Sequence, residues 1–320
     1  MENCKVVFFT EEISESLRRY MQKIFPHKSD VYLSYCIEHA AGRVPSLVVV
    51  KGDGEIVGCH LYYCTKALLN GEEIDTQWGH DTYLDKEYRK EIGVDFLLAR
   101  KKIPAFGVGL TETNAKMRKL MKSVFLDGVF NYYTITPALL LSPFQKLLQS
   151  KPLIKNVESI KGNGALFTRV RAASQIVIPN DGYWYKGYYD LDFVRDTSFL
   201  ENRFFRCKVH DYKVFASNDS YFVVRESSYR GLPALMLSDF RYSISNPDSV
   251  DSIMKAVMKL ARKSHFGIVF FVCGDKRVES FFKRRIHFKT HLEFISSYKI
   301  SPNTTFSLTG GDSDAEFLKA

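Results

Sequence analysis

The spacing of apolar and polar residues divides the first part of the chain into short strands and amphipathic helices. An apolar run at 5–9 predicts a strand, and helical spacing then predicts two helices, one ended by Pro26 and one capped by Ser29. Turn residues separate three further apolar or alternating runs, which predict antiparallel strands at 47–50, 55–69 and 73–84.

A helix–strand–helix unit follows these strands. A basic turn at 85–93 leads into a helix that ends near Lys102. The apolar run at 105–110 predicts a strand, and 113–123 predicts a second helix. With one more strand at 127–136, the first set of elements is expected to end near residue 137.

The second half repeats this order of elements. Residues 138–180 hold prolines, glycines and weak periodicity, so we expect a connecting region with one helix near 144–149. A helix is expected at 191–206. The elements expected after it are strands at 212–216, 221–225 and 233–240, a helix at 248–263, a strand at 267–273, a helix at 276–285 and a strand at 291–300. Such a repeat indicates a tandem duplication, with domains at 1–137 and 181–320.

The composition is that of a folded protein without a membrane span. Its 320 residues are 45% hydrophobic and 14% aromatic, enough for two ordinary cores. No apolar run reaches the roughly 18 residues of a transmembrane helix, and the first residues lack the pattern of a signal peptide. We therefore expect a cytoplasmic protein whose six scattered cysteines are buried thiols.

The positive charge is concentrated in the second half of the chain. Residues 1–150 hold 19 Lys and Arg against 18 Asp and Glu, a net charge of +1, whereas 151–320 hold 26 against 18, a net charge of +8. Such a surface attracts polyanions, although most charged faces are only solvated.

The order of elements, together with residues 84–93, resembles the GNAT-type acyl-CoA acyltransferases. That family binds the acyl-CoA pyrophosphate in a loop Arg/Gln-x-x-Gly-x-Gly/Ala at the start of its central helix, where backbone N–H groups face the anion. Arg89 and the pair Ile92-Gly93 match the loop, and one of its two glycines is missing. The resemblance implies an α+β (mixed α/β) fold of two tandem GNAT-like domains, each a mostly antiparallel mixed sheet flanked by helices.

The resemblance also implies an acyl-CoA site in the first domain, for acetyl-CoA or another acyl-CoA as co-substrate. Asn114 and Phe125 have the family's spacing between an Asn and a Phe, although an Asn at this place also reads as an ordinary helix cap. The residues expected to bind the cofactor are Tyr83, Leu84, Arg89, Lys90, Ile92, Gly93 and Asn114. The corresponding loop of the second domain, 244–249, has no glycine, so that degenerate domain is not expected to bind CoA.

Acyl transfer to an amine also needs a base that accepts a proton from the acceptor ammonium. Strand alternation puts Asp81 and Tyr83 on one face and His80 on the other, so Asp81 is the first candidate base and His80 the second. Leu120 stands where many family members carry a Tyr as general acid. Tyr83 is the candidate substitute acid, with Tyr132 and Tyr133 as alternatives or packing residues.

No metal site is expected from the sequence. Cys59 and Cys64 are an odd number of positions apart on one strand, so their thiols diverge, and His60 stands alone. The segment 309–314 is expected to be a surface loop, and its two aspartates supply too few oxygen ligands for a cation. The basic segment 283–285 is expected to serve packing or acceptor binding.

The leading hypothesis is an acyl-CoA-dependent N-acyltransferase, with acetyl the favoured acyl group and a small-molecule amine as the acceptor. Nucleic acid is not an expected partner under this hypothesis. One alternative is a Fem-like transferase that uses aminoacyl-tRNA, which the missing glycine and the basic second half favour. Another is a non-catalytic binding protein of GNAT type.

Overall fold

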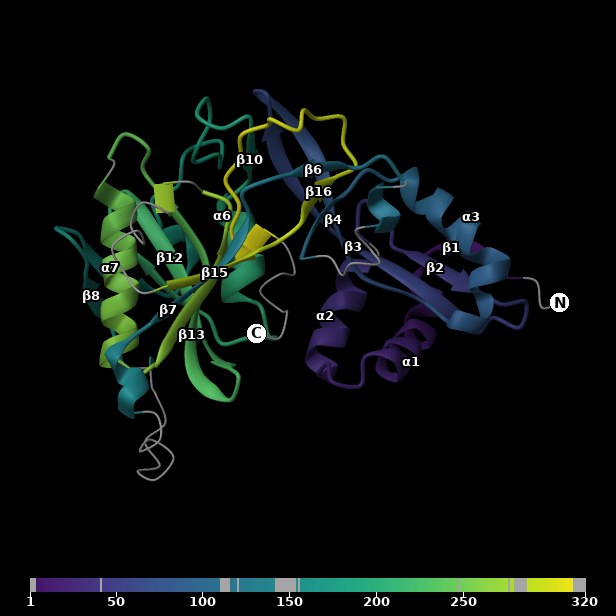
Figure 1. Ribbon diagram of the computed structural model, residues 1–320, viewed down its shortest axis with the longest axis horizontal. Helices are drawn as coiled ribbons and strands as arrows, with labels where there is room; N and C mark the ends of the chain where they lie inside the picture. The colour runs from purple at the N-terminus through teal and green to yellow at the C-terminus, as the bar shows by residue number, and fades with distance from the viewer. Residues whose placement is uncertain are drawn as a thin grey trace. The chain divides into compact units, whose positions relative to one another are not determined.

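The computed structural model describes residues 4–40, 42–109, 116–119, 121–141, 154, 156–246, 248–275, 277–278 and 287–312. The chain forms two compact units (Figure 1). Unit 1 comprises Met1–Lys66, Ile74–Leu126 and Glu293–Asn303, and unit 2 comprises Ala67–Glu73, Asp127–Leu292 and Thr304–Ala320. Within the described residues, no helix is long and apolar enough to cross a membrane.

Unit 1 is built on one mixed sheet. Its strands, in spatial order, are β1 (Lys5–Phe8), β2 (Leu47–Val50), β3 (Ile56–Leu69), β4 (Glu72–Leu84), β5 (Phe106–Val108), β16 (Phe294–Ser296) and β6 (Val124–Leu126). Strands β4 and β5 pair in parallel, as expected for strands joined through a helix. All strands predicted up to Leu84 are present, with bounds shifted by at most one residue.

Helices cover both faces of this sheet. The turn η1 (Glu11–Ile13), α1 (Ser14–Ile24) and α2 (Asp30–Ala40) lie on one face, and α3 (Arg89–Lys101) lies on the other (Figure 1). Ser29 caps α2 as predicted, because its Oγ accepts a hydrogen bond from the Tyr32 N–H at 3.2 Å. Ile92 and Phe96 of α3 pack into a core with Leu47, Val49 and Val57.

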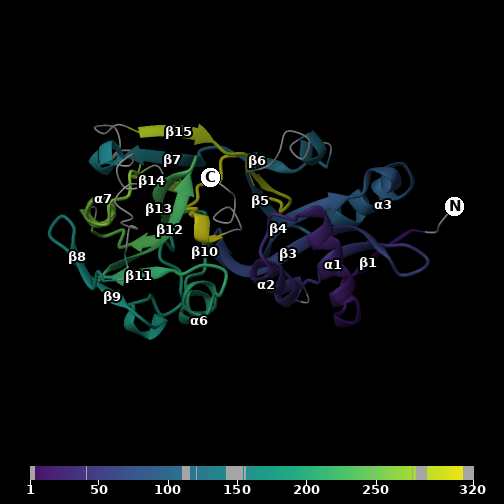
Figure 2. The same cartoon turned by 90° about the horizontal axis from the view of Figure 1, so that it is seen from below.

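Unit 2 holds a second mixed sheet. Its strands, in spatial order, are β15 (His287–His291), β7 (Phe130–Ile135), β14 (Ile268–Cys273), β13 (Leu232–Tyr242), β12 (Ser220–Tyr229), β11 (Lys213–Ala216), β9 (Leu166–Val170) and β8 (Ser159–Lys161). The predicted amphipathic helix is α7 (Asp248–Lys263), which packs its apolar side against one face of the sheet (Figure 2).

Three expectations for unit 2 were wrong. Strands β8 and β9 lie where a connecting region was expected, because strands this short leave little periodicity to read. Residues 191–206 form a short strand, β10 (Leu191–Phe193), then α6 (Thr197–Leu200) and a π-helical turn, η5 (Glu201–Phe205), rather than one helix. Finally, the expected last strand at 291–300 is divided into β15 and β16.

Two strands lie in a different sheet from the one that the repeat pattern predicted. Strand β7 was expected to close the first sheet, but it lies between β14 and β15 in the second. Strand β16 was expected in the second sheet, but it lies between β5 and β6 in the first. There Phe294 stacks on Trp78, with ring centroids 5.9 Å apart. That residues 1–137 and 181–320 form separate domains therefore stays a prediction.

Some predicted features lie partly or wholly outside the described residues. They are the helices at 113–123, of which 116–119 are described as helical, and at 144–149 and 276–285, together with Asn114, Leu120 and the basic segment 283–285. The segment before Ser313 is described and differs from expectation. Thr309 and Asp312 are buried rather than on a surface loop, because they bond to charged groups inside unit 2.

All six cysteines are free thiols, and Cys36, Cys59 and Cys273 are buried as expected. The other three are only partly buried.

Candidate functional site

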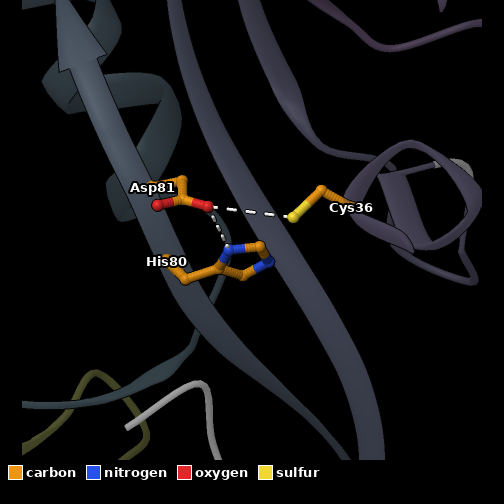
Figure 3. A group of neighbouring side chains, drawn as sticks. All are labelled: Cys36, His80 and Asp81. Carbon is orange, nitrogen blue, oxygen red and sulfur yellow. Dashed lines mark hydrogen bonds and ion pairs between the residues drawn. The ribbon is translucent and has the colours of Figure 1, made fainter. Parts of the chain in front are cut away.

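A backbone irregularity in β4 organises the candidate site. Asp81 has a φ of 44°, a left-handed conformation that is uncommon for a residue other than glycine. The alternation of side chains is interrupted there, so the prediction that His80 and Asp81 lie on opposite faces was wrong. Their side chains lie together, with His80 Nδ1 3.3 Å from Asp81 Oδ2 (Figure 3).

Helix α2 and the turn before it supply the other partners of the Asp81 carboxylate. The Lys28 ammonium contacts Oδ1. The Tyr32 hydroxyl donates to Oδ2 at 2.7 Å, and the Cys36 thiol lies 3.8 Å from the same oxygen. Both carboxylate oxygens are thus already in contact with hydrogen-bond donors.

These partners set the protonation state of Asp81. Burial acts to raise the pKa of its carboxyl group, but the hydrogen bond and charge of His80, followed by the charge of Lys28, outweigh burial and hold that pKa well below its ordinary value. A carboxylate with such a low pKa is a weak proton acceptor, and it suits a group that orients and stabilises a neighbouring imidazolium. Since Nδ1 of His80 faces the carboxylate, Nε2 is the nitrogen left to face a substrate.

The same group of side chains also presents three atoms that bind metals elsewhere. The ligand atoms of Cys36, His80 and Asp81 lie within 4.8 Å of one another (Figure 3). The Lys28 ammonium on Asp81 disfavours a cation at this place, because the two positive charges would share one carboxylate.

Strands β4 and β5 separate immediately before the Asp81 irregularity. They pair at Trp78–Phe106 alone among the described residues, and β4 continues to Leu84. Beyond that pair β5 is joined on its other side by β16. Among the described residues, no strand pairs with this edge of β4 from Gly79 onward, so the edge suits an inserted extended ligand.

The start of α3 provides a second feature, an uncapped helix N-terminus. A short 3₁₀ turn, η2 (Lys86–Tyr88), leads into α3, and neither N-cap residue, Asp85 or Tyr88, makes a side-chain capping bond. The Tyr88 N–H bonds to the Asp85 carbonyl and the Arg89 N–H to the Lys86 carbonyl, so the N–H groups of Lys90 and Glu91 are the first-turn donors that suit an anion. Arg89 and Lys90 are exposed beside it.

The predicted cofactor residues fall into two groups here. Arg89 Nε donates to the Leu84 carbonyl at 2.9 Å, and its guanidinium lies 5.7 Å from the centre of the Tyr83 ring, so these three residues are neighbours. Ile92 is buried in the core, so only its backbone faces the helix start. Gly93 is partly buried in the first turns of α3.

The corresponding helix start in unit 2 is occupied by an acidic side chain. Asp219 accepts hydrogen bonds from Asn246 Nδ2 at 3.0 Å and from Ser249 Oγ at 3.1 Å, next to the first turn of α7. A carboxylate at this position repels phosphate. The expectation that the second repeat does not bind CoA stays a prediction.

Sequence reasoning did not identify Lys28, Tyr32 and Cys36 as site residues. They come from α2 and the turn before it, more than forty residues away from Asp81 in the sequence, and their spacing is that of ordinary helix and turn residues. A buried cluster of Arg100, Arg118, Tyr62 and His60 was missed for the same reason. The sequence feature that indicates this cluster is Gly79 in β4, because a side chain at that position would collide with His60.

No protein-family model matches the chain, and no curated protein matches its sequence. Solved structures do match its fold. A probable N-acyltransferase from Enterococcus faecalis has a TM-score of 0.59 at 10% identity, covering 92% of this chain and 72% of that one. A GCN5-related N-acetyltransferase from Anabaena variabilis has a TM-score of 0.56 at 12% identity, with the same coverage.

A third similar structure is N-myristoyltransferase from Saccharomyces cerevisiae with bound myristoyl-CoA. It has a TM-score of 0.55 at 9% identity, covering 94% of this chain and 84% of that one. The chain has the tandem GNAT fold. The mixed α/β fold class expected from the sequence is therefore confirmed, and in this GNAT fold β4, β5 and α3 are the elements that carry the candidate site.

Proposed function

We propose that the protein is an acyl-CoA-dependent N-acyltransferase whose active site lies in unit 1. The observation that carries the proposal is the separation of β4 from β5 after Trp78–Phe106, followed at once by the Asp81 irregularity and the uncapped start of α3. These features offer an extended ligand a free strand edge and offer its phosphates a helix N-terminus.

The acyl-CoA would lie across these two features. Its pyrophosphate would meet N–H groups in the first turn of α3, with Arg89 and Lys90 adding positive charge. Ile92 and Gly93, whose N–H groups bond within the helix, would border this site. Its pantetheine would pair with the backbone of Tyr83 and Leu84. Asn114 remains a proposed contact on the basis of its spacing from Phe125. Acetyl-CoA is the first co-substrate to test.

The chemistry would be a direct attack by an amine. His80 Nε2 accepts a proton from the acceptor ammonium while Asp81 holds the ring through Nδ1 and stabilises the imidazolium. The neutral amine then forms a C–N bond with the thioester carbonyl carbon. Backbone N–H groups of the separated strand stabilise the oxyanion. The C–S bond breaks as the carbonyl re-forms, and the attached nitrogen loses its remaining extra proton to water. The thiolate takes a proton from Tyr83, the proposed donor, and water returns a proton to Tyr83.

The division of roles differs from the order of candidates that the sequence favoured. Asp81 was the first candidate base, and its low pKa and four neighbours favour an orienting role instead. A small-molecule amine is the proposed acceptor.

Calorimetry with acetyl-CoA tests the proposal. We expect binding that weakens about tenfold or more in Arg89→Glu, because a charge-assisted contact to the pyrophosphate becomes a repulsion. Arg206→Glu makes the same charge change at an exposed position in unit 2 and is expected to bind as the wild type does. Absence of binding at millimolar acetyl-CoA and at millimolar longer acyl-CoAs would exclude the proposed function.

A second candidate is transfer from aminoacyl-tRNA. The net charge of +8 on residues 151–320 favours it. Binding of tRNA that falls steeply with increasing salt, together with no response to acyl-CoA, would place this function first.

A further inference from the structure

Two buried arginines in unit 1 lie beside the vertex of the β4–β5 opening. Arg100 at the end of α3 is 6% exposed and Arg118 is 3% exposed. Arg118 Nη2 would lie 3.6 Å from a Cβ placed on Gly79, next to the Trp78–Phe106 pair. The two positive charges act on each other and on the hydroxyl of Tyr62.

The described part of the chain offers these arginines no carboxylate. The hydrogen bond found there is from Arg118 Nη1 to Ser297 Oγ at 3.2 Å, which is a neutral partner. Nε of each arginine is buried without a hydrogen-bond partner among the described residues, and so are the Tyr62 hydroxyl and Nε2 of His60. Four neighbouring buried side chains, two of them cationic, therefore each have a polar atom without a hydrogen-bond partner among the described residues.

The electrostatics indicate that this place is suited to an anion. Burial, followed by the charge of Arg118, lowers the pKa of Arg100 to about 9. Burial and the two arginines hold the pKa of His60 well below its ordinary value, so its imidazole is neutral. An anion among these groups would offset the cost of burying two like charges.

Unit 2 provides an internal comparison. Arg195 and Arg241 are also fully buried, and there Asp239 and Asp312 lie against their guanidinium groups. The arginine pair of unit 1 has no equivalent acidic pair among the described residues, so its counter-ion has to come from outside this part of the chain.

We propose that Arg100, Arg118 and Tyr62 bind the terminal carboxylate of a short dicarboxylic acyl group carried by CoA, such as a succinyl group. This inference rests on the proposed acyl-CoA function, because the acyl end of a pantetheine inserted between β4 and β5 would reach the vertex beside Gly79. A carboxylate has two oxygens and about four lone-pair positions, which suits two guanidinium groups and one hydroxyl. An apolar acyl end would leave those donors unsatisfied.

The test compares two stable thioether analogues by calorimetry, 3-carboxypropyl-CoA and 3-carbamoylpropyl-CoA, which have the same shape and differ in charge. We expect the wild-type protein to bind the carboxylate analogue about 10- to 100-fold more tightly. The preference should disappear in Arg118→Gln and in Arg100→Gln and persist in Arg206→Gln. If Arg118→Gln and Arg100→Gln fail to fold, the comparison of the two analogues in the wild-type protein still tests the carboxylate site.

The outcomes separate this inference from the proposed function. Equal binding of both analogues would overturn the carboxylate site and leave the acyl-CoA function in place. If neither analogue binds while acetyl-CoA does, this inference fails and the acyl-CoA function stands. If acetyl-CoA and longer acyl-CoAs also fail to bind, both fail. A rise in melting temperature with free succinate in the wild type, absent in Arg118→Gln, would be expected alongside the carboxylate preference.

Discussion

Asp312→Asn is expected to destabilise unit 2 severely, because it removes a charge from a fully buried network. Asp312 Oδ1 lies 2.6 Å from Arg195 Nη2 and 3.6 Å from Arg241 Nη2, and none of the three side chains is exposed. Oδ2 accepts hydrogen bonds from the Thr309 N–H at 2.7 Å and from its hydroxyl at 3.2 Å.

The magnitude follows from these contacts. The neutral amide leaves two guanidinium groups with less negative charge, and breaking a buried ion pair in this way costs about 3–5 kcal/mol. The amide also has one acceptor oxygen where the carboxylate has two. If that oxygen stays on Arg195, an NH₂ group faces the Thr309 N–H, and a buried donor without an acceptor costs about 1–3 kcal/mol. The two effects overlap, so we expect a total loss of about 3–5 kcal/mol.

Urea denaturation with a fluorescence readout of unit 2 measures this loss. The chain has two tryptophans, Trp78 in unit 1 and Trp184 in unit 2, so a Trp78→Phe background leaves Trp184 as the reporter. The control is Asp127→Asn, whose side chain is 92% exposed beside His291, and no measurable change is expected from it. A loss below about 1 kcal/mol for Asp312→Asn, with an unchanged denaturant slope, would refute the reasoning.

Three further predictions follow from single residues. His80→Gln should lower kcat by about 10²- to 10⁴-fold with acyl-CoA affinity unchanged, and equal kcat values in mutant and wild type would exclude His80 as the base. Gly79→Ala should lower the melting temperature, because its Cβ would lie 2.8 Å from His60 Cε1, and an unchanged melting temperature would contradict the close approach. Burial raises the pKa of Asp192 to about 6. Between about pH 4 and 6 the folded state therefore keeps a proton that the unfolded chain has lost, so the free energy of unfolding falls as pH rises. Asp192→Asn should remove that fall in urea titrations at pH 4, 5, 6 and 7, and a variant with the wild-type pH dependence would show that Asp192 is not its source.

Local patterns determined much of the secondary structure in advance. The strands up to Leu84, the cap at Ser29 and the amphipathic helix at 248–263 all follow from side-chain periodicity and turn chemistry, which act over a few residues. The order of these elements, together with residues 84–93, resembles the GNAT family, and that resemblance predicted the fold. The start of α3 was also found this way, since a helix N-terminus and its basic residues are adjacent in the sequence.

Only the tertiary structure decided which sheet each late strand joins and which side chains meet. Periodicity indicates which face of a strand is buried, but it carries no information about the neighbouring strand, so the exchange of β7 and β16 could not be read from it. The left-handed backbone of Asp81 interrupts the strand alternation that the sequence pattern assumes, and His80 and the Asp81 carboxylate lie together there. Lys28, Tyr32 and Cys36 come to that carboxylate from about fifty residues away, and only packing of α2 against the sheet brings them there.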